Sequence, residues 1–192
     1  MNAVPGAVAK GALLCGVVAM SVGGPLAIAQ SASAAPGDVV EVSADGVTYG
    51  PTFPGSLFGA IRLVPGSSDT TTLWVRNPTS ATAYLRVVLT EVVADDQDYW
   101  GALSVRTTVL GQVASMPMPS PSTCTVLATA VPMGAGQALP VIFALSLADL
   151  NGRQGQNGRA DFAIGVTLSE VAYPTDCSTP AVVVPATPTT RS

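Results

Sequence analysis

The sequence of 192 residues contains no histidine. A serine or cysteine nucleophile most often relies on histidine as its base, and zinc sites draw heavily on the same side chain. The motifs Gly-x-Ser-x-Gly and His-Glu-x-x-His are missing as well. The sequence therefore predicts a protein that is not an enzyme and binds no cofactor. A carboxylate pair of the glycosidase kind stays open, because the sequence does not place Glu41, Glu91 and Glu170 relative to one another.

Positive charge is scarce too. Lys10 is the only lysine, and the chain has 8 basic residues against 12 acidic ones. All 12 acidic residues follow residue 37, together with the seven arginines, so this part of the chain has a net charge of 7 − 12 = −5. An acidic surface without lysine does not neutralise phosphates, which excludes nucleic acid and anionic membranes as partners.

Charged residues are also missing from most of the N-terminus, where only Lys10 precedes Asp38. Residues 12–20 form an apolar run that ends shortly before a Gly-Gly-Pro break, and the small residues at 32–34 fit a cleavage site, with a second one at 27–29. This pattern predicts a signal peptide over residues 1–34 and a secreted protein that leaves the membrane after cleavage. An uncleaved membrane anchor is the alternative, since about 20 apolar residues span a bilayer.

Cysteine is rare, with three residues in the chain. Removal of the signal peptide would take away Cys15 and leave Cys124 and Cys177. Two cysteines in an oxidising compartment most simply pair, so we predict a disulfide between Cys124 and Cys177. An intermolecular disulfide and two free thiols are the alternatives.

Helical periodicity is missing from the rest of the chain, where apolar and polar residues alternate instead. Such alternation is typical of antiparallel sheets with one buried face, and two such sheets pack into a sandwich. We therefore predict one all-β domain over residues 35–172, a two-sheet antiparallel β-sandwich of jelly-roll or immunoglobulin-like type with about eight strands. The predicted strands are 38–43, 47–49, 70–77, 83–93, 103–109, 125–131, 139–145 and 162–168.

The C-terminal residues have a different composition. Residues 173–192 are rich in proline and threonine, and neither a second apolar span nor a basic terminus occurs among them. Segments of this kind bury too little apolar surface to offset the entropy lost on ordering. The sequence predicts an extended tail here that is largely disordered at its end.

One acidic segment stands out as a candidate site. Asp95, Asp96 and Asp98 are close enough in sequence to bind calcium, which prefers several oxygen ligands, although the spacing of a known calcium loop is missing. The favoured interpretation is a solvated loop between two strands. Tyr99 and Trp100 follow directly, and they could form an exposed binding patch or fold back over the edge of the core.

The stretches 63–67, 70–78, 83–87, 136–143, 151–158 and 160–162 follow one order: a Pro-Gly turn, a strand ending in Arg-Asn, a strand with Tyr-Leu-Arg, a later strand, a Gln-Gly turn and a final strand. This order of turns and strands resembles the camelysin/TasA-type secreted proteins over most of residues 38–172. The resemblance implies an exported, jelly-roll-like sandwich that often forms extracellular matrix fibres, in which an N-terminal strand of one subunit completes the sheet of the next. Residues 35–43 are the matching segment here. The camelysin branch carries a metalloprotease label, which the missing histidine contradicts.

These observations lead to one expected function and one alternative. We expect a secreted, non-catalytic structural or matrix protein whose partner is another copy of itself or a component of the cell envelope. Strand donation by residues 35–43 would provide the self-association. The alternative is a monomeric extracellular module that binds an envelope partner or a glycan.

Overall fold

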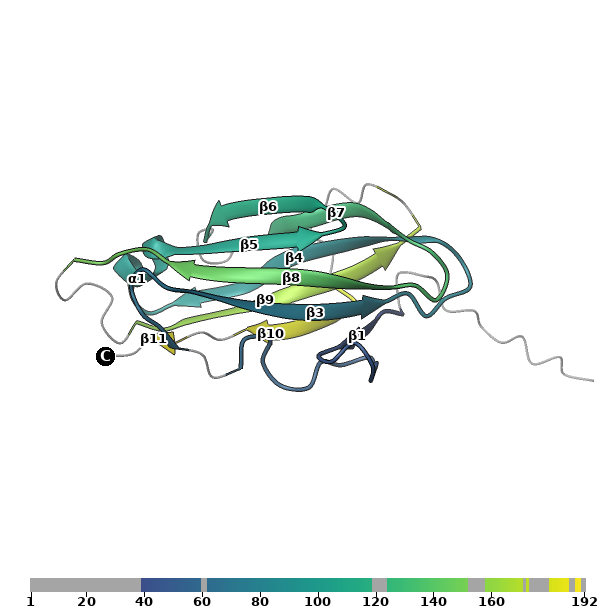
Figure 1. Cartoon of the computed structure of the whole chain (residues 1–192), viewed down its shortest axis with the longest axis horizontal. Helices are drawn as coiled ribbons and strands as arrows, with labels where there is room; N and C mark the ends of the chain where they lie inside the picture. The colour runs from purple at the N-terminus through teal and green to yellow at the C-terminus, as the bar shows by residue number, and fades with distance from the viewer. Residues whose placement is uncertain are drawn as a thin grey trace, which may run out of the picture. The chain divides into compact units, whose positions relative to one another are not determined.

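The computed structural model describes residues 39–59, 62–118, 124–151, 158–170, 172, 180–186 and 189–190. Two antiparallel sheets lie face to face, one with strands in the order β1-β3-β8-β5-β6 and one in the order β10-β9-β4-β7 (Figure 1). The predicted antiparallel β-sandwich is thereby confirmed. The elements are β1 (Glu41–Ser43), β2 (Arg62–Leu63), β3 (Ser68–Arg76), β4 (Ala83–Ala94), α1 (Gln97–Ala102), β5 (Leu103–Val109), β6 (Gln112–Pro117), β7 (Thr125–Met133), β8 (Ala138–Leu147), β9 (Ala160–Ser169), β10 (Val182–Ala186) and β11 (Thr189–Thr190).

The predicted signal peptide, residues 1–34, lies outside the described residues. Within the part of the chain that the structure does describe, no helix has the length and hydropathy needed to cross a membrane.

The core lies between the two sheets and follows the alternation of the sequence. In β8, Val141, Phe143 and Leu145 are fully buried, whereas Ile142 on the opposite face is 39% exposed. β9 places Ile164 against the same core from the other sheet. Alternation with a period of two therefore determines which face of each strand is buried.

The C-terminal segment corrects the predicted tail. Val182–Ala186 forms β10, which pairs with β9 along the edge of the four-stranded sheet. Val184 is completely buried and Val183 is 40% exposed, so this segment alternates like the other strands. An edge strand tolerates Pro185, whose missing N–H would weaken a central strand. The β-sandwich therefore extends beyond residue 172.

The predicted strand 47–49 is also wrong. The Asp45 carboxylate accepts hydrogen bonds from the backbone N–H groups of Val47 and Thr48, both at 2.8 Å. These bonds fold the segment into bends, and only Gly50 forms an isolated bridge, with Val42. Local side-chain hydrogen bonds thus replace a strand, as is common after aspartate in turns.

A strand that the alternation did not predict follows β5. Leu110 and Gly111 have φ values of 46° and 78°, the signature of a type I′ turn, which joins β5 to β6 as a tight hairpin. β6 ends the five-stranded sheet on the side opposite β1.

The outer faces of the two sheets differ in how well they are covered. On the four-stranded sheet, a Cβ added at Gly165 would lie 2.7 Å from a methyl carbon of Val88 and 2.8 Å from Pro180, so Pro180 lies against this face. On the five-stranded sheet, Ile142 and Val113 point outward and are 39% and 52% exposed. The outer face of the five-stranded sheet therefore presents Val113 and Ile142 to solvent, whereas Val93 and Val183 are the exposed large apolar residues in the described strands of the four-stranded sheet.

Candidate functional site

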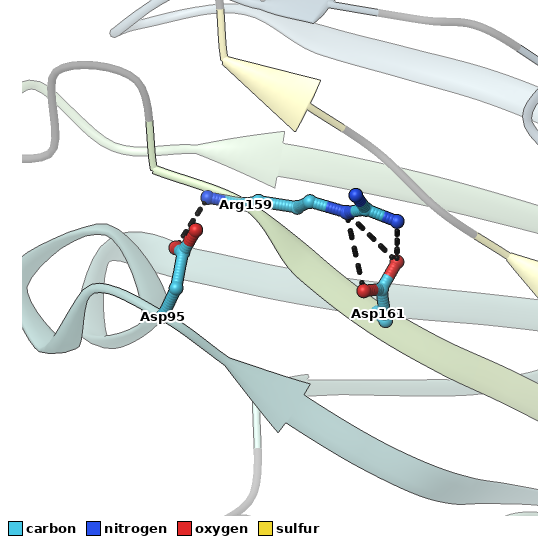
Figure 2. Close-up of polar contacts among 3 residues, drawn as sticks. All are labelled: Asp95, Arg159 and Asp161. Atoms are coloured by element: carbon cyan, nitrogen blue, oxygen red, sulfur yellow. Dashed lines mark hydrogen bonds and ion pairs between the residues drawn. The ribbon is translucent and has the colours of Figure 1, made fainter.

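The acidic loop between β4 and β5 uses two of its carboxylates in backbone hydrogen bonds. An oxygen of Asp95 accepts a hydrogen bond from the backbone N–H of Arg159 at 2.6 Å, which ties the end of β4 to the start of β9 (Figure 2). Arg159 itself forms an ion pair with Asp161, with its Nε 3.2 Å from a carboxylate oxygen. Asp96 caps α1, and its side chain accepts a hydrogen bond from the N–H of Tyr99 at 2.7 Å.

This geometry does not support calcium binding by Asp95, Asp96 and Asp98, the less favoured interpretation of this segment. Asp95 and Asp96 bind two different backbone groups, and Asp98 is exposed in the first turn of α1. No group of three or more potential metal ligands of the His, Cys, Asp or Glu type occurs among the described residues. The carboxylates of this loop hold the connection between the two sheets in place.

Tyr99 and Trp100 do not form the predicted exposed patch. Tyr99 is completely buried and Trp100 is 5% exposed. The short helix α1 carries the chain from β4 in one sheet to β5 in the other, and it places both rings against the end of the core. Gly158 permits this packing, because an added Cβ there would lie 2.6 Å from the Tyr99 side chain. The alternative, in which both rings fold over the edge of the core, is correct.

Burial of Tyr99 leads to a testable pH dependence. Loss of hydration on burial, with a smaller effect from the charge of Asp95, raises the pKa of Tyr99 from 10.0 to about 12. Because the folded state binds the phenol proton more tightly, this stabilisation is complete below pH 10 and is lost as the pH rises through 12. We expect the wild-type protein to lose about 2–3 kcal/mol of unfolding free energy over this range.

Tyr99→Phe should remove that loss. The Tyr99 hydroxyl is buried and has no hydrogen-bond partner among the described residues, so its removal should leave stability at neutral pH unchanged or raise it by about 1 kcal/mol. Urea denaturation of both proteins at pH 7 and at about pH 11, where about half of the loss has developed, measures the difference. An equal alkaline loss in the variant would show that another group causes it.

The structure presents a second candidate site at β1, the edge of the five-stranded sheet. β1 pairs with only Trp74, Val75 and Arg76 of β3, in an antiparallel register. Val40 and Val42 are 3% and 1% exposed, so this short segment nevertheless contributes to the core. Residues 68–73 of β3 pair with β8 on one side and with no strand of the described chain on the other.

Polar side chains fix the position of β1. The Nε of Arg76 donates a hydrogen bond to a carboxylate oxygen of Glu41 at 2.6 Å, and a second guanidinium nitrogen forms an ion pair with the same oxygen. The Arg76 guanidinium also lies 4.4 Å from the centre of the Tyr49 ring, a cation–π geometry. The sequence did not indicate this cluster, because its members are 35 and 27 residues apart and only the fold brings them together.

The turn after β1 is equally well ordered by hydrogen bonds. The N–H of Thr48, the Ser43 hydroxyl and the N–H of Val47 all donate to Asp45, and they hold the pKa of its carboxyl well below its usual range. Gly46 has φ +73° and lies against the Trp74 ring, which leaves no room for a side chain. A cavity of about 280 Å³ lies beside this turn, and Tyr49 is among the residues that line it.

One predicted feature lies only partly within the described residues. Cys124 directly precedes β7, whereas Cys177 lies outside them. The disulfide between these two cysteines stays a prediction.

Comparisons with known proteins return similar folds only. No family model and no curated protein matches the chain. Three similar solved structures are the N-terminal domain of PorA, a PapD-like domain of human CEP192 and the CupB6 tip adhesin from Pseudomonas aeruginosa. Their identities are 12%, 11% and 14%, with TM-scores of 0.43, 0.38 and 0.38. The matches cover 79%, 91% and 69% of this chain and 97%, 96% and 40% of the other chains. At these values no argument about function follows.

Proposed function

We propose that the protein is a secreted, non-catalytic structural subunit, similar to the camelysin/TasA type, that self-associates by exchange of strand β1. One observation carries the proposal. β1 is a strand of three residues at a sheet edge, yet together with the residue before it, it contributes two valines to the core. A segment with these properties can leave its own sheet and make the same contacts in a second copy.

The energetics of exchange favour this segment over the longer strands. Only three residues of β3 pair with β1, whereas all nine pair with β8. Leaving the sheet exposes Val40 and Val42, which costs about 1.5–3 kcal/mol for each side chain until they are buried again. An acceptor copy restores the same valine contacts and the same Glu41–Arg76 ion pair, so exchange becomes favourable at high protein concentration.

The acceptor strand is only partly paired by β1, and the Thr71 hydroxyl beyond it donates to the Leu57 carbonyl at 3.0 Å. Residues 68–73 of β3 carry no strand on the side that faces away from β8. Backbone groups on such an edge can pair with an added strand, which is the basis of strand addition between subunits. Residues 35–38, the first part of the predicted donor, lie outside the described residues.

Deletion of residues 35–43 is a poor test, because it would remove two core valines and destabilise the subunit. A mixture of two cysteine variants is better. Val42 and Val75 lie opposite each other, and the N–H and C=O of Val42 bond to Gly50, so this is a non-hydrogen-bonded pair. Cα atoms in such pairs are about 4.5 Å apart, which suits a disulfide.

We expect coexpressed Val42→Cys and Val75→Cys chains to form a covalent dimer on oxidation, because only exchange brings β1 of one copy next to β3 of another. Each variant expressed alone serves as a control and should give no such dimer. Non-reducing gels measure the bond, and light scattering with electron microscopy of the wild-type protein measures assembly. A mixture without crosslinks, together with a wild-type monomer at every concentration, would rule out exchange.

The cavity beside β1 favours a second candidate, a monomeric module that binds an envelope partner or a glycan. Tyr49 lines this cavity, and aromatic rings are common in such sites. Binding of the monomer to purified cell-envelope glycan, lost in Tyr49→Ala, would support this candidate.

A further inference from the structure

Within the part of the chain that the structure describes, the edge of the five-stranded sheet opposite β1 is formed by β6, whose only strand neighbour there is β5. The type I′ turn at Leu110 and Gly111 makes Val109 and Gln112 the closing hydrogen-bonded pair of the hairpin. Hydrogen-bonded and non-hydrogen-bonded pairs alternate from that point. The backbone groups of Val113, Ser115 and Pro117 therefore point away from β5, toward the open edge.

The N–H of Met118 donates a hydrogen bond to the carbonyl of Leu103 at 3.0 Å, which confirms which backbone groups of this strand face β5. Met118 lies an even number of residues after Gln112, so the backbone N–H and C=O groups of both residues point toward β5. Pro117 has no N–H and cannot donate to an added strand. Val113 and Ser115 are thus the two residues of β6 with both a donor and an acceptor on the open edge.

This edge lacks the usual protection against pairing. Natural edge strands carry lysine, other charges or bulges that block addition of another chain. β6 has no charged residue, and Val113 is 52% exposed. Pro117 protects only the far end of the strand.

The charge pattern favours a second copy as the occupant. Residues 99–148 contain none of the 12 acidic residues of the chain, and Arg106 is their only charged residue. Two copies of an acidic protein can therefore approach through β6 without the repulsion that opposes contact elsewhere. The arrangement of Val113 and Ser115 around Ala114 is also self-complementary, as a two-fold interface requires.

We propose that β6 pairs antiparallel with β6 of a second copy, with Ala114 on the two-fold axis. Val113 of each copy then faces Ser115 of the other, and these residues exchange four backbone hydrogen bonds across the interface. The pairing joins two five-stranded sheets into one continuous sheet of ten strands. Within one copy, Ile142 of β8, Thr108 of β5 and Val113 of β6 lie side by side on the outer face of the sheet. The pairing continues this row of side chains into the second copy. β1 plays no part in this dimer, so it is independent of the proposed strand exchange.

Ser115→Pro removes the outward N–H and leaves the bonds to β5 in place, because an edge strand tolerates proline where its N–H faces outward. We expect this variant to raise the dissociation constant of the dimer at least about tenfold, since one bond is lost in each half of the interface. Ser115→Ala keeps the backbone N–H and should dimerise like the wild type. Sedimentation velocity of the full secreted chain over a concentration series measures the constant, and thermal unfolding checks the fold.

A cysteine at the axis tests the register. Ala114→Cys should give a covalent dimer on oxidation, because the two copies of residue 114 form a non-hydrogen-bonded pair about 4.5 Å apart at Cα. Gln112→Cys is a matched control on the same strand face and is more exposed. Its two copies would be offset by four residues, about 13 Å along the strand, which is too far for a disulfide.

Each outcome decides the proposal. A wild-type dimer that Ser115→Pro weakens, together with crosslinking of Ala114→Cys and not of Gln112→Cys, supports it. A chain that stays monomeric at its highest soluble concentration, or a dimer that Ser115→Pro leaves unchanged, overturns it. Failure of the Val42 and Val75 crosslink would leave this dimer untouched, so the two proposals fail separately.

Discussion

Val184→Asp should lower the unfolding free energy of the protein strongly. Val184 is completely buried and pairs with Ile164 of β9. An aspartate at this position would bury a charge in an apolar core, which we expect to cost on the order of 4 kcal/mol. Whole domains have unfolding free energies of only about 5–15 kcal/mol. Urea denaturation followed by circular dichroism measures the change in midpoint.

Val183→Asp is the matched control, because the same substitution is made one residue earlier on the other face of β10. Val183 is 40% exposed, so the new carboxylate can remain hydrated, and we expect a loss of about 1 kcal/mol or less. Equal stability of the two variants would mean that β10 does not contribute to the core.

This contrast also shows which part of the fold the sequence could predict. β8 and β9 alternate over ten residues, and a pattern of that length is hard to produce by any other structure, whereas bulges interrupt the alternation of β4. β10 has five residues, includes a proline and lies in a proline- and threonine-rich stretch. Its composition favours a tail, and only the open edge of β9, which is a tertiary feature, makes it a strand.

The candidate sites were less predictable than the strands. Three aspartates followed by Tyr99 and Trp100 indicate a solvated loop by composition, yet α1 turns both rings inward because it crosses from one sheet to the other at the end of the core. Short helices of this kind have no periodicity from which the buried face can be inferred. The composition of the segment contains no signal for that inward rotation.

The edges of the sheets pose a different problem. The cluster of Glu41, Arg76 and Tyr49 depends on contacts across at least 27 residues, which no local pattern encodes. The open edge of β6, in contrast, follows from a two-residue turn and its flanking pattern once both are recognised. A sequence can therefore reveal an edge strand where a short turn creates it. It cannot reveal which distant residues lie beside that strand.

Asn77→Ala should be the most destabilising change among the polar residues of the turns. Asn77 is completely buried where β3 ends, and its side-chain amide donates to the carbonyls of Ala81 at 2.8 Å and Gly134 at 3.0 Å. Its side-chain oxygen accepts hydrogen bonds from the N–H of Thr79 at 3.1 Å and from the Thr79 hydroxyl at 2.8 Å. The side chain thus joins the turn between β3 and β4 to the turn between β7 and β8.

Alanine at position 77 would remove the side-chain hydrogen bonds of a completely buried residue, and we expect a loss of about 3 kcal/mol in unfolding free energy. Gln137→Ala is the control in the same β7–β8 turn, because the Gln137 side chain is exposed and accepts one hydrogen bond from the N–H of Gly134 at 2.7 Å. Its loss should cost about 1 kcal/mol or less, since water can replace it. If the two variants were equally stable, the contribution of Asn77 would be that of a single exposed turn bond, and the two turns would be held together by strand pairing alone.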